Sequence, residues 1–403
     1  MIRARLVQLR RVLATEGLPG LRRRLIRVGH RMLGEQQEPL PLNPGDVSDS
    51  ATLAAPQPVT VAPGPLRVGW ITTPPGAGSG GHTTMLRMIE GLEKAGHATS
   101  LYLYDIFRGD LGQHERVIRA HWPGVTASVH DVRDGLGDAD VWIATSWQTA
   151  HVLASRPEAT GRRMYFVQDY EPYFYPRGAL YALAEDTYRF GFTGITAGAW
   201  LAEELTARFG MRCGHFEFGA DTGVYTVTSP GERNGVVFYT KPGVARRGHE
   251  IGMLALEVFA SDHPDADIHL FGDPPGATPF AAHSHGRVTP TELNGIYNLC
   301  RVGLSLSFTN VSLIPWELLA SGATPVVNDA PHNRMVLRNP HVAWATAGPA
   351  AIADALSAAW DAFTPGTTPR LLSASIAGDN WDDAASTVTE FIERTARHDA
   401  FHR

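Results

Sequence analysis

The segment SLSFTNVSLIPWELLASGATPVVND, residues 305–329, decides the fold class of this chain. An apolar strand is expected over residues 302–306, and a polar loop follows it at 307–312. Pro315 then opens a short helix, because proline is favoured in the first helical turn. A second, β-branched strand follows that helix at residues 324–327. This order of strand, helix and strand predicts a βαβ unit of a parallel sheet.

The junction between the first of these strands and the helix predicts a ligand site. Free backbone N–H groups and the positive end of the helix dipole make such a junction attractive to anions. Glu317, in the first helical turn, suits a neutral partner such as a sugar hydroxyl, although the helix dipole alone also favours a carboxylate there. The loop supplies candidate residues for binding this ligand, namely Ser307, Thr309, Asn310, Val311 and Ser312.

A second strand-to-helix junction, at residues 236–248, carries three cations. Lys241, Arg246 and Arg247 follow an apolar strand, and a multivalent anion would relieve their mutual repulsion. In a parallel sheet this junction and the 307–312 loop open at the same carboxyl edge, where ligands bind. A solvated run of charge is the alternative.

Alternating strands and helices predict two domains. The pattern runs over residues 66–225 and restarts at Gly235. Strands that are apolar throughout indicate parallel sheets covered by helices on both faces. We therefore expect an α/β chain with two Rossmann-like, doubly wound domains, residues 66–225 and 226–378, which face a central cleft. A helix within residues 379–403 is expected to cross back to the first domain.

The first 65 residues differ from the rest in charge and composition. Residues 1–32 carry nine arginines and a single acid, Glu16, with leucines at helical spacing. The basic amphipathic segment 1–35 is therefore a candidate for binding an anionic membrane surface, and a solvated helix pair or a protein-docking arm is the alternative. Residues 36–65, rich in proline, serine and alanine, are expected to form a disordered linker.

The composition is that of an ordinary globular protein, with 43% hydrophobic and 19% charged residues. No apolar run reaches the roughly 20 residues of a membrane span, and no secretory signal is recognisable. We therefore expect a cytoplasmic protein, peripheral at most on the inner face of the plasma membrane. Cys213 and Cys300 form no metal-binding pattern, and His283 and His285 are expected in a polar loop. Neither a metal nor a nucleic acid is expected as a partner.

Polar residues also follow two strands of the first predicted domain. A glycine-rich loop follows the first strand, and its alternative role is that of a steric turn. A carboxylate- and tyrosine-rich stretch follows the other strand, where it offers bases and stacking faces to a sugar, or packs into the core. The candidates are Gly80, Gly81 and His82 after the first strand, and Gln168, Asp169, Tyr170, Glu171 and Tyr173 after the other.

The chain resembles retaining GT-B glycosyltransferases of family four over roughly residues 66–395. Lys241 with Arg246 or Arg247 matches the pair that binds the donor diphosphate in that family. Glu317, within PWELLASGATPVV, matches the glutamate that holds the nucleotide ribose. The resemblance also implies that Gly272 and Val288 lie near the nucleobase.

Bacterial rhamnosyltransferases of polyrhamnose and S-layer glycans are more similar still. The stretches that carry this resemblance are FVQDYEPYFYPRG at 166–178, AEDTY at 184–188 and GFTGITAG at 191–198. Thr309 stands where the wider family has a second glutamate, which argues against a glucosyl donor and leaves the sugar open.

The resemblance implies a retaining, metal-independent hexosyltransferase without a cofactor. Its donor would be dTDP-rhamnose or a related nucleotide sugar, and its acceptor a growing, lipid-linked surface glycan. Retaining enzymes of this family have no agreed protein nucleophile, so front-face chemistry is expected. The candidate catalytic residues are Lys241, Arg246, Arg247, Asp169 and Glu171. A nucleotide-sugar epimerase of the same fold and a catalytically silent sugar-binding scaffold are the alternatives.

Overall fold

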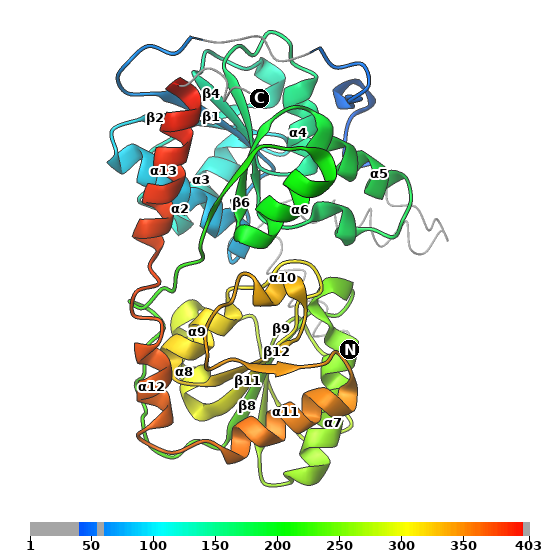
Figure 1. Cartoon of the computed structure of the whole chain (residues 1–403), viewed down its shortest axis with the longest axis vertical. Coiled ribbons are helices and arrows are strands. Elements are labelled where there is room, and N and C mark those ends of the chain that lie inside the picture. Colours follow the sequence, from blue (N-terminus) through cyan, green and yellow to red (C-terminus); the bar gives the residue numbers. More distant parts are fainter. Residues whose placement is uncertain (1–39, 55–59, 398–403) are drawn as a thin grey trace.

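The structure, a computed structural model, describes residues 40–54 and 60–397. These residues form two lobes, one above the other in Figure 1, and chain segments join them along one side. The predictions for residues 1–35, including the membrane-binding segment, lie outside the described residues.

The first lobe is built on a seven-stranded sheet whose paired strands are all parallel. Its order is β3-β2-β1-β4-β5-β6-β7, so the direction of winding reverses between β1 and β4. Strands β4 and β6 are buried along their whole length, as strands covered on both faces must be, and β1 and β5 are buried over most of theirs. The strands are β1 (Arg67–Thr72), β2 (Ala98–Leu103), β3 (Ser128–Asp131), β4 (Val141–Ala144), β5 (Arg162–Val167), β6 (Thr193–Ala197) and β7 (Cys213–Phe216).

The second lobe repeats this plan with six parallel strands. Its order is β10-β9-β8-β11-β12-β13, and the winding reverses between β8 and β11. The strands are β8 (Gly235–Thr240), β9 (Asp267–Gly272), β10 (His283–Gly286), β11 (Cys300–Ser305), β12 (Thr324–Asn328) and β13 (Ala343–Ala345). Two doubly wound parallel sheets confirm the predicted α/β fold class.

Helices follow most strands and cover the sheets. In the first lobe they are α2 (Gly80–Lys94), α3 (Leu111–His121), α4 (Trp147–Ala154), α5 (Ala179–Asp186) and α6 (Ala199–Phe209). In the second lobe they are α7 (His249–Asp262), α8 (Pro290–Leu299), α9 (Ile314–Ser321), α10 (Pro331–Arg334), α11 (Pro349–Asp361) and α12 (Thr368–Ala374). Short 3₁₀ turns include η1 (Pro44–Asp46), η3 (Glu171–Phe174) and η5 (Ala245–Arg247).

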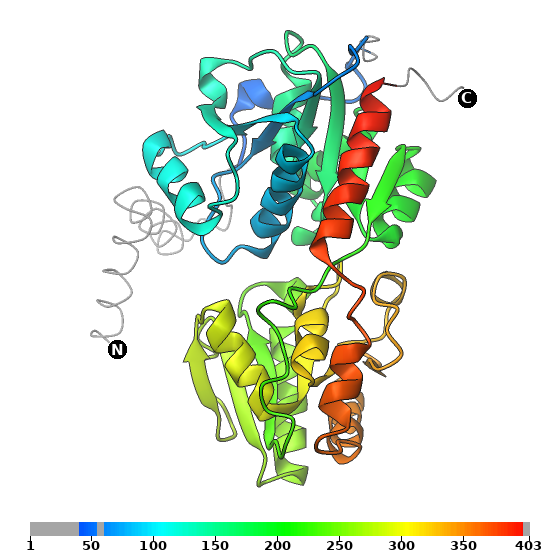
Figure 2. The ribbon, with the colours of Figure 1, turned by 90° about the vertical axis from the view of Figure 1, so that its left-hand side faces the viewer.

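The last helix, α13 (Trp381–Arg397), returns to the first lobe and packs along α2, as Figure 2 shows. Its apolar stripe, which includes Val388 and Ile392, is buried in the same core cluster as α2. The two helices approach closely at Gly91, where an added Cβ would lie 2.7 Å from the Cβ of Ala385. A side chain larger than hydrogen at this position would push the helices apart.

The disordered linker predicted for residues 36–65 was wrong for residues 40–54, which pack on the first lobe. Asp46 is buried and pairs with Arg156 at 2.7 Å, and the Tyr104 hydroxyl donates to the same carboxylate. Ser50 donates to Asp186 at 2.6 Å. Composition concealed this because a few specific polar contacts, not apolar periodicity, hold the segment.

His283 and His285 lie in strand β10, so their predicted loop was wrong. Both rings stack on that of His269 in the neighbouring strand β9, with centroids 5.1 and 5.2 Å away. A short polar strand at the edge of a sheet carries no apolar alternation, which explains why the sequence concealed it.

Candidate active site

Both lobes place polar loops at the points where their winding reverses. In the second lobe, the cationic stretch 241–248 follows β8, and the loop 306–313 follows β11, the two strands that flank the reversal. In the first lobe, the loop 73–79 follows β1 and leads into α2. Parallel α/β sheets bind ligands in the crevice outside the carboxyl ends of such strands. The fold therefore brings together the two junctions that the sequence singled out.

Arg246 lies at the contact between the lobes. Its guanidinium stacks over the Phe174 ring of η3, 4.1 Å from the ring centroid. Its Nε lies 3.6 Å from Oδ2 of Asp169, too far for a hydrogen bond, and this buried Nε has no hydrogen-bond partner among the described residues. A buried donor without an acceptor is costly, so this group suits an anionic ligand.

The two neighbouring cations differ in their surroundings. Arg247 is held in the second lobe, where it donates to Oγ of Ser307 at 3.0 Å, and burial lowers its pKa. The Lys241 ammonium lies 5.9 Å from the centroid of the Tyr239 ring and is partly exposed. One hydrogen-bonded and one partly exposed cation beside Arg246 give the junction the means to bind more than one phosphate oxygen.

The loop after β11 contacts the first lobe through the side-chain amide of Asn310. Asn310 is buried and donates to the backbone oxygens of Gln168 and Ala197, at 2.9 and 3.0 Å. Thr309 is also buried, and its hydroxyl donates to Oδ2 of Asp169 at 2.9 Å. Val311 is buried as well, while the Ser312 hydroxyl lies 3.1 Å from that of Ser305. These bonds fix the loop against the carboxyl end of β5.

Asp169 is consequently the carboxylate at the centre of the site. Burial raises its pKa, and the guanidinium groups of Arg247 and Arg246 and the Thr309 hydroxyl act in the opposite direction. Its side chain is 14% exposed, so a small group can still reach it. A carboxylate in these surroundings can accept a hydrogen bond from a substrate hydroxyl or exchange a proton with it.

Glu317 is carried on the first turn of α9, as the sequence predicted. The Tyr297 hydroxyl donates to its Oε2 at 3.0 Å, and Tyr225 makes a further side-chain hydrogen bond to it. Burial raises the pKa of Glu317 to about 7. This carboxylate is therefore enclosed by donors while remaining near the start of the helix.

The glycine-rich loop and the strand β5 meet in the first lobe. The Gln168 side chain donates to the backbone oxygen of Gly81 at 3.0 Å. Gly80 and Gly81 are exposed, and Ser79 caps α2. Burial lowers the pKa of His82 to about 4, so its ring is neutral at physiological pH. A neutral imidazole at this position can donate or accept a hydrogen bond.

Tyr170 and Glu171, which the sequence predicted to face the acceptor, are both buried. Tyr170 is fully buried, and its hydroxyl donates to Glu185 at 3.0 Å, behind η3. Glu171 is 6% exposed, and its Oε2 accepts from the backbone N–H of Trp147 at the start of α4. Both residues support the fold of this region. The 3₁₀ turn at η3 buries both of these consecutive side chains, which could not be read from the sequence.

The remaining candidates are spread around the site. Tyr173 is exposed at 47%, and its ring stacks edge-on against Tyr170. Gly272 ends β9 with a φ of 110°, and an added Cβ would lie 2.5 Å from the backbone oxygen of Thr240, so only glycine fits there. Val288 is partly buried after β10.

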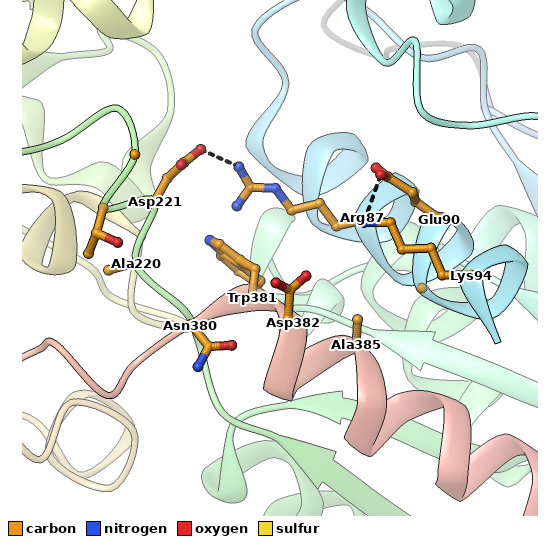
Figure 3. A pocket seen from close by; sticks show the side chains of 12 residues that line it. Arg87, Glu90, Lys94, Ala220, Asp221, Asn380, Trp381, Asp382 and Ala385 are labelled. Carbon is orange, nitrogen blue, oxygen red and sulfur yellow. Dashed lines mark hydrogen bonds and ion pairs between the residues drawn. The ribbon is translucent and has the colours of Figure 1, made fainter.

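Sequence patterns missed the residues that reach the site from other elements. Tyr297 comes from α8, Tyr225 from the segment that joins the lobes, and Arg87 from α2. Arg87 pairs with Asp221 at 2.6 Å beside a cavity of about 310 Å³, shown in Figure 3. Tyr225 ends the stretch GADTGVY at 219–225, which resembles a domain-boundary signature of the family, whereas Tyr297 and Arg87 lie in no local motif and only the fold reveals them.

Among the described residues, no three or more His, Cys, Asp and Glu side chains are arranged to hold a metal ion. In the same part of the chain, no helix combines the length and apolar character that crossing a membrane requires.

Proteins of known structure share this architecture, and two family models match the sequence. Anabaena HepE, solved with UDP and glucose, superposes with a TM-score of 0.61 over 82% of this chain and 99% of its own, at 14% identity. TarM gives 0.65 over 83% of this chain and 99% of its own, at 8% identity. Residues 126–197 match the family model "WsaF, N-terminal domain", and residues 234–357 match "WsaF, C-terminal domain". The chain is therefore WsaF-like in sequence and has the GT-B fold of these glycosyltransferases.

A curated relative of this WsaF-like chain is the O-antigen biosynthesis protein RfbC of Myxococcus xanthus. The two are 34% identical over 270 residues, which is 63% of this chain. The matched region spans only 21% of the length of RfbC.

Proposed function

We propose that this WsaF-like chain transfers rhamnose, or a related deoxyhexose, from a dTDP-linked donor to a growing cell-surface glycan, with retention at the anomeric carbon. The resemblance to family-four rhamnosyltransferases supports the sugar, the nucleotide and the retention. The similarity to an O-antigen biosynthesis protein supports a surface glycan as the product.

The observation that carries this proposal is the buried Nε of Arg246, which has no hydrogen-bond partner among the described residues and is flanked by Lys241 and Arg247 at the winding reversal of the second sheet. A diphosphate at this point would supply acceptor oxygens to all three side chains. Guanidinium groups suit phosphate because their donors form a planar fork. Glu317, on the neighbouring helix, would accept hydrogen bonds from the ribose hydroxyls.

The chemistry is a front-face substitution. The bond between the sugar anomeric carbon and the diphosphate oxygen breaks, and the acceptor oxygen bonds to the same face of the sugar. The leaving diphosphate oxygen takes the acceptor proton. Lys241, Arg246 and Arg247 would stabilise the negative charge that develops on that oxygen, which is an interaction stronger in the transition state than in the ground state.

The first lobe would position the acceptor. Asp169 lies 3.6 Å from the Arg246 guanidinium, so an acceptor hydroxyl bound to this carboxylate would be close to the leaving group. His82, Gln168 and the exposed Tyr173 ring would contact the acceptor sugar. We propose a lipid-linked acceptor at the cytoplasmic membrane face, which the basic residues 1–32 would approach.

The test is transfer by the purified full-length chain, with a panel of dTDP-, UDP- and GDP-sugars and a rhamnose-containing acceptor. We expect product with the dTDP-deoxyhexose, an anomeric configuration equal to that of the donor by NMR, and undiminished turnover in EDTA. Inversion, or activity abolished by EDTA and restored by a divalent cation, would overturn the mechanism. Conversion of the donor to an isomer without any acceptor would identify an epimerase instead.

A further inference from the structure

The Glu317 carboxylate is enclosed by two tyrosine hydroxyls that come from different elements. Tyr297, on α8, is fully buried and donates to Oε2 at 3.0 Å. Tyr225 is 7% exposed, lies just after the first crossing between the lobes, and makes a second side-chain hydrogen bond to Glu317. The two rings contact each other with centroids 5.9 Å apart. Both hydroxyls therefore bind the same carboxylate from within a buried cluster.

These hydroxyls remain protonated donors at any physiological pH. Burial raises the pKa of Tyr297 well above its usual value, and it also raises that of Tyr225. An ionised carboxylate has about four lone-pair sites, so two such bonds leave others for a ligand. The arrangement therefore orients the Glu317 carboxylate and leaves it able to accept further hydrogen bonds from a ligand.

Other charges facing Glu317 come from two further elements. Arg87, on α2 of the first lobe, favours the ionised form, while Asp221, in the segment between the lobes, opposes it. Arg87 and Asp221 pair at 2.6 Å and point toward one another in Figure 3. These two charges act on the pKa of Glu317 in opposite directions, and the tyrosine hydroxyls are the larger influences that counter its burial.

We propose that Tyr225 and Tyr297 are positioning residues for donor binding, which hold the Glu317 carboxylate ionised and oriented toward the ribose hydroxyls of the nucleotide. This inference rests on the proposed function, because it takes the ribose as the ligand of Glu317. Removing a hydroxyl leaves part of a buried carboxylate without a donor, and the carboxylate then binds a proton more readily or turns away.

The test compares Tyr297→Phe and Tyr225→Phe with wild type by titration calorimetry with dTDP between pH 6 and 9. Each change is expected to weaken dTDP binding by about three- to tenfold at pH 8, the net effect of losing one ordinary hydrogen bond, because Glu317 keeps its other donor. The decline of affinity toward low pH, expected near pH 7 in wild type, should move to higher pH in both variants. In turnover assays the donor KM should rise while kcat changes little.

Two controls make the outcome decisive. Tyr181→Phe removes a comparable tyrosine–carboxylate bond, to Glu185 at 3.2 Å in the first lobe, and should leave dTDP binding unchanged. Glu317→Gln should weaken dTDP binding and abolish its pH dependence near pH 7. If Glu317→Gln has no effect, the proposed ribose contact fails. If Glu317→Gln weakens binding but the tyrosine variants match wild type in affinity and pH midpoint, or lose only thermal stability, the positioning role is overturned.

Discussion

Replacing Arg246 by alanine tests the diphosphate site most directly. Arg246 is the cation that contacts both lobes, through the Phe174 ring at 4.1 Å and the Asp169 carboxylate at 3.6 Å. Its Nε has no hydrogen-bond partner in the described residues, so the variant sacrifices no existing hydrogen bond of that atom. The loss measured with a ligand therefore reports mainly the bond that the ligand would have made.

The expected magnitude follows from one charge-assisted hydrogen bond to phosphate, about 1.5–3 kcal/mol. Each 1.4 kcal/mol is a factor of ten, so Arg246→Ala should weaken dTDP binding by roughly 10- to 100-fold. A nucleoside monophosphate does not reach as far as the diphosphate, so binding of dTMP should weaken by less than about threefold. Arg246→Lys keeps the charge but loses the planar fork, and an intermediate affinity is expected.

The assay is titration calorimetry with dTDP and dTMP on wild type, the two Arg246 variants and Arg370→Ala, an exposed arginine on α12 that serves as the matched control. Thermal unfolding of each variant accompanies it, because Asp169 loses a neighbouring cation. Equal losses for dTDP and dTMP, or none for either, would refute the placement of the second phosphate at Arg246.

Two predictions concern stability. Burial raises the pKa of Glu171 from 4.5 to about 8, so the stability contributed by its neutral form is present below pH 4.5 and is lost as the pH rises to 8. Glu171→Gln should therefore flatten the decline in melting temperature between pH 5 and 8. An unchanged profile would contradict a raised pKa of Glu171 in the folded protein. The second compares two helical glycines: Gly91→Ala should destabilise by about 1–3 kcal/mol because its Cβ would collide with Ala385, whereas Gly295→Ala, with nothing within 4 Å, should stabilise by about 0.5–1 kcal/mol. Urea unfolding measures both, and equal signs would show that α2 and α13 are not packed as described.

The fold was predictable because its information is local. The strand, loop and helix around Glu317 each have their own signature in periodicity, β-branching and proline placement, and β11, α9 and β12 appear where the sequence indicated. The short edge strands were not predictable, because β10 and β13 are three or four residues long and β10 is polar. Their strand conformation depends on pairing with the preceding strand, β9 or β12, rather than on their own residues.

The candidate site was predictable only as far as residues lie directly after a strand. Lys241 and Arg246 lie in the stretch after β8, as predicted, and Glu317 lies in the first turn of α9. The direction of a side chain within a tight turn was not predictable. The sequence therefore did not reveal that Tyr170 and Glu171 are buried while the preceding Asp169 reaches the site. Contacts that cross between elements, such as Tyr297 to Glu317, leave no trace in spacing along the chain.

The contacts of Asp169 connect the two lobes in one small volume, and this constrains how a donor can enter. Thr309 and Arg246 both reach Asp169 from the second lobe, while Asn310 binds backbone oxygens of the first. A diphosphate that binds Arg246 must share this guanidinium with Asp169 or displace the carboxylate. Because like charges repel, the arriving phosphate favours a protonated Asp169, and burial already raises the pKa of this group. Donor binding by the proposed enzyme should therefore be accompanied by proton uptake, which calorimetry in buffers of different ionisation enthalpy would detect.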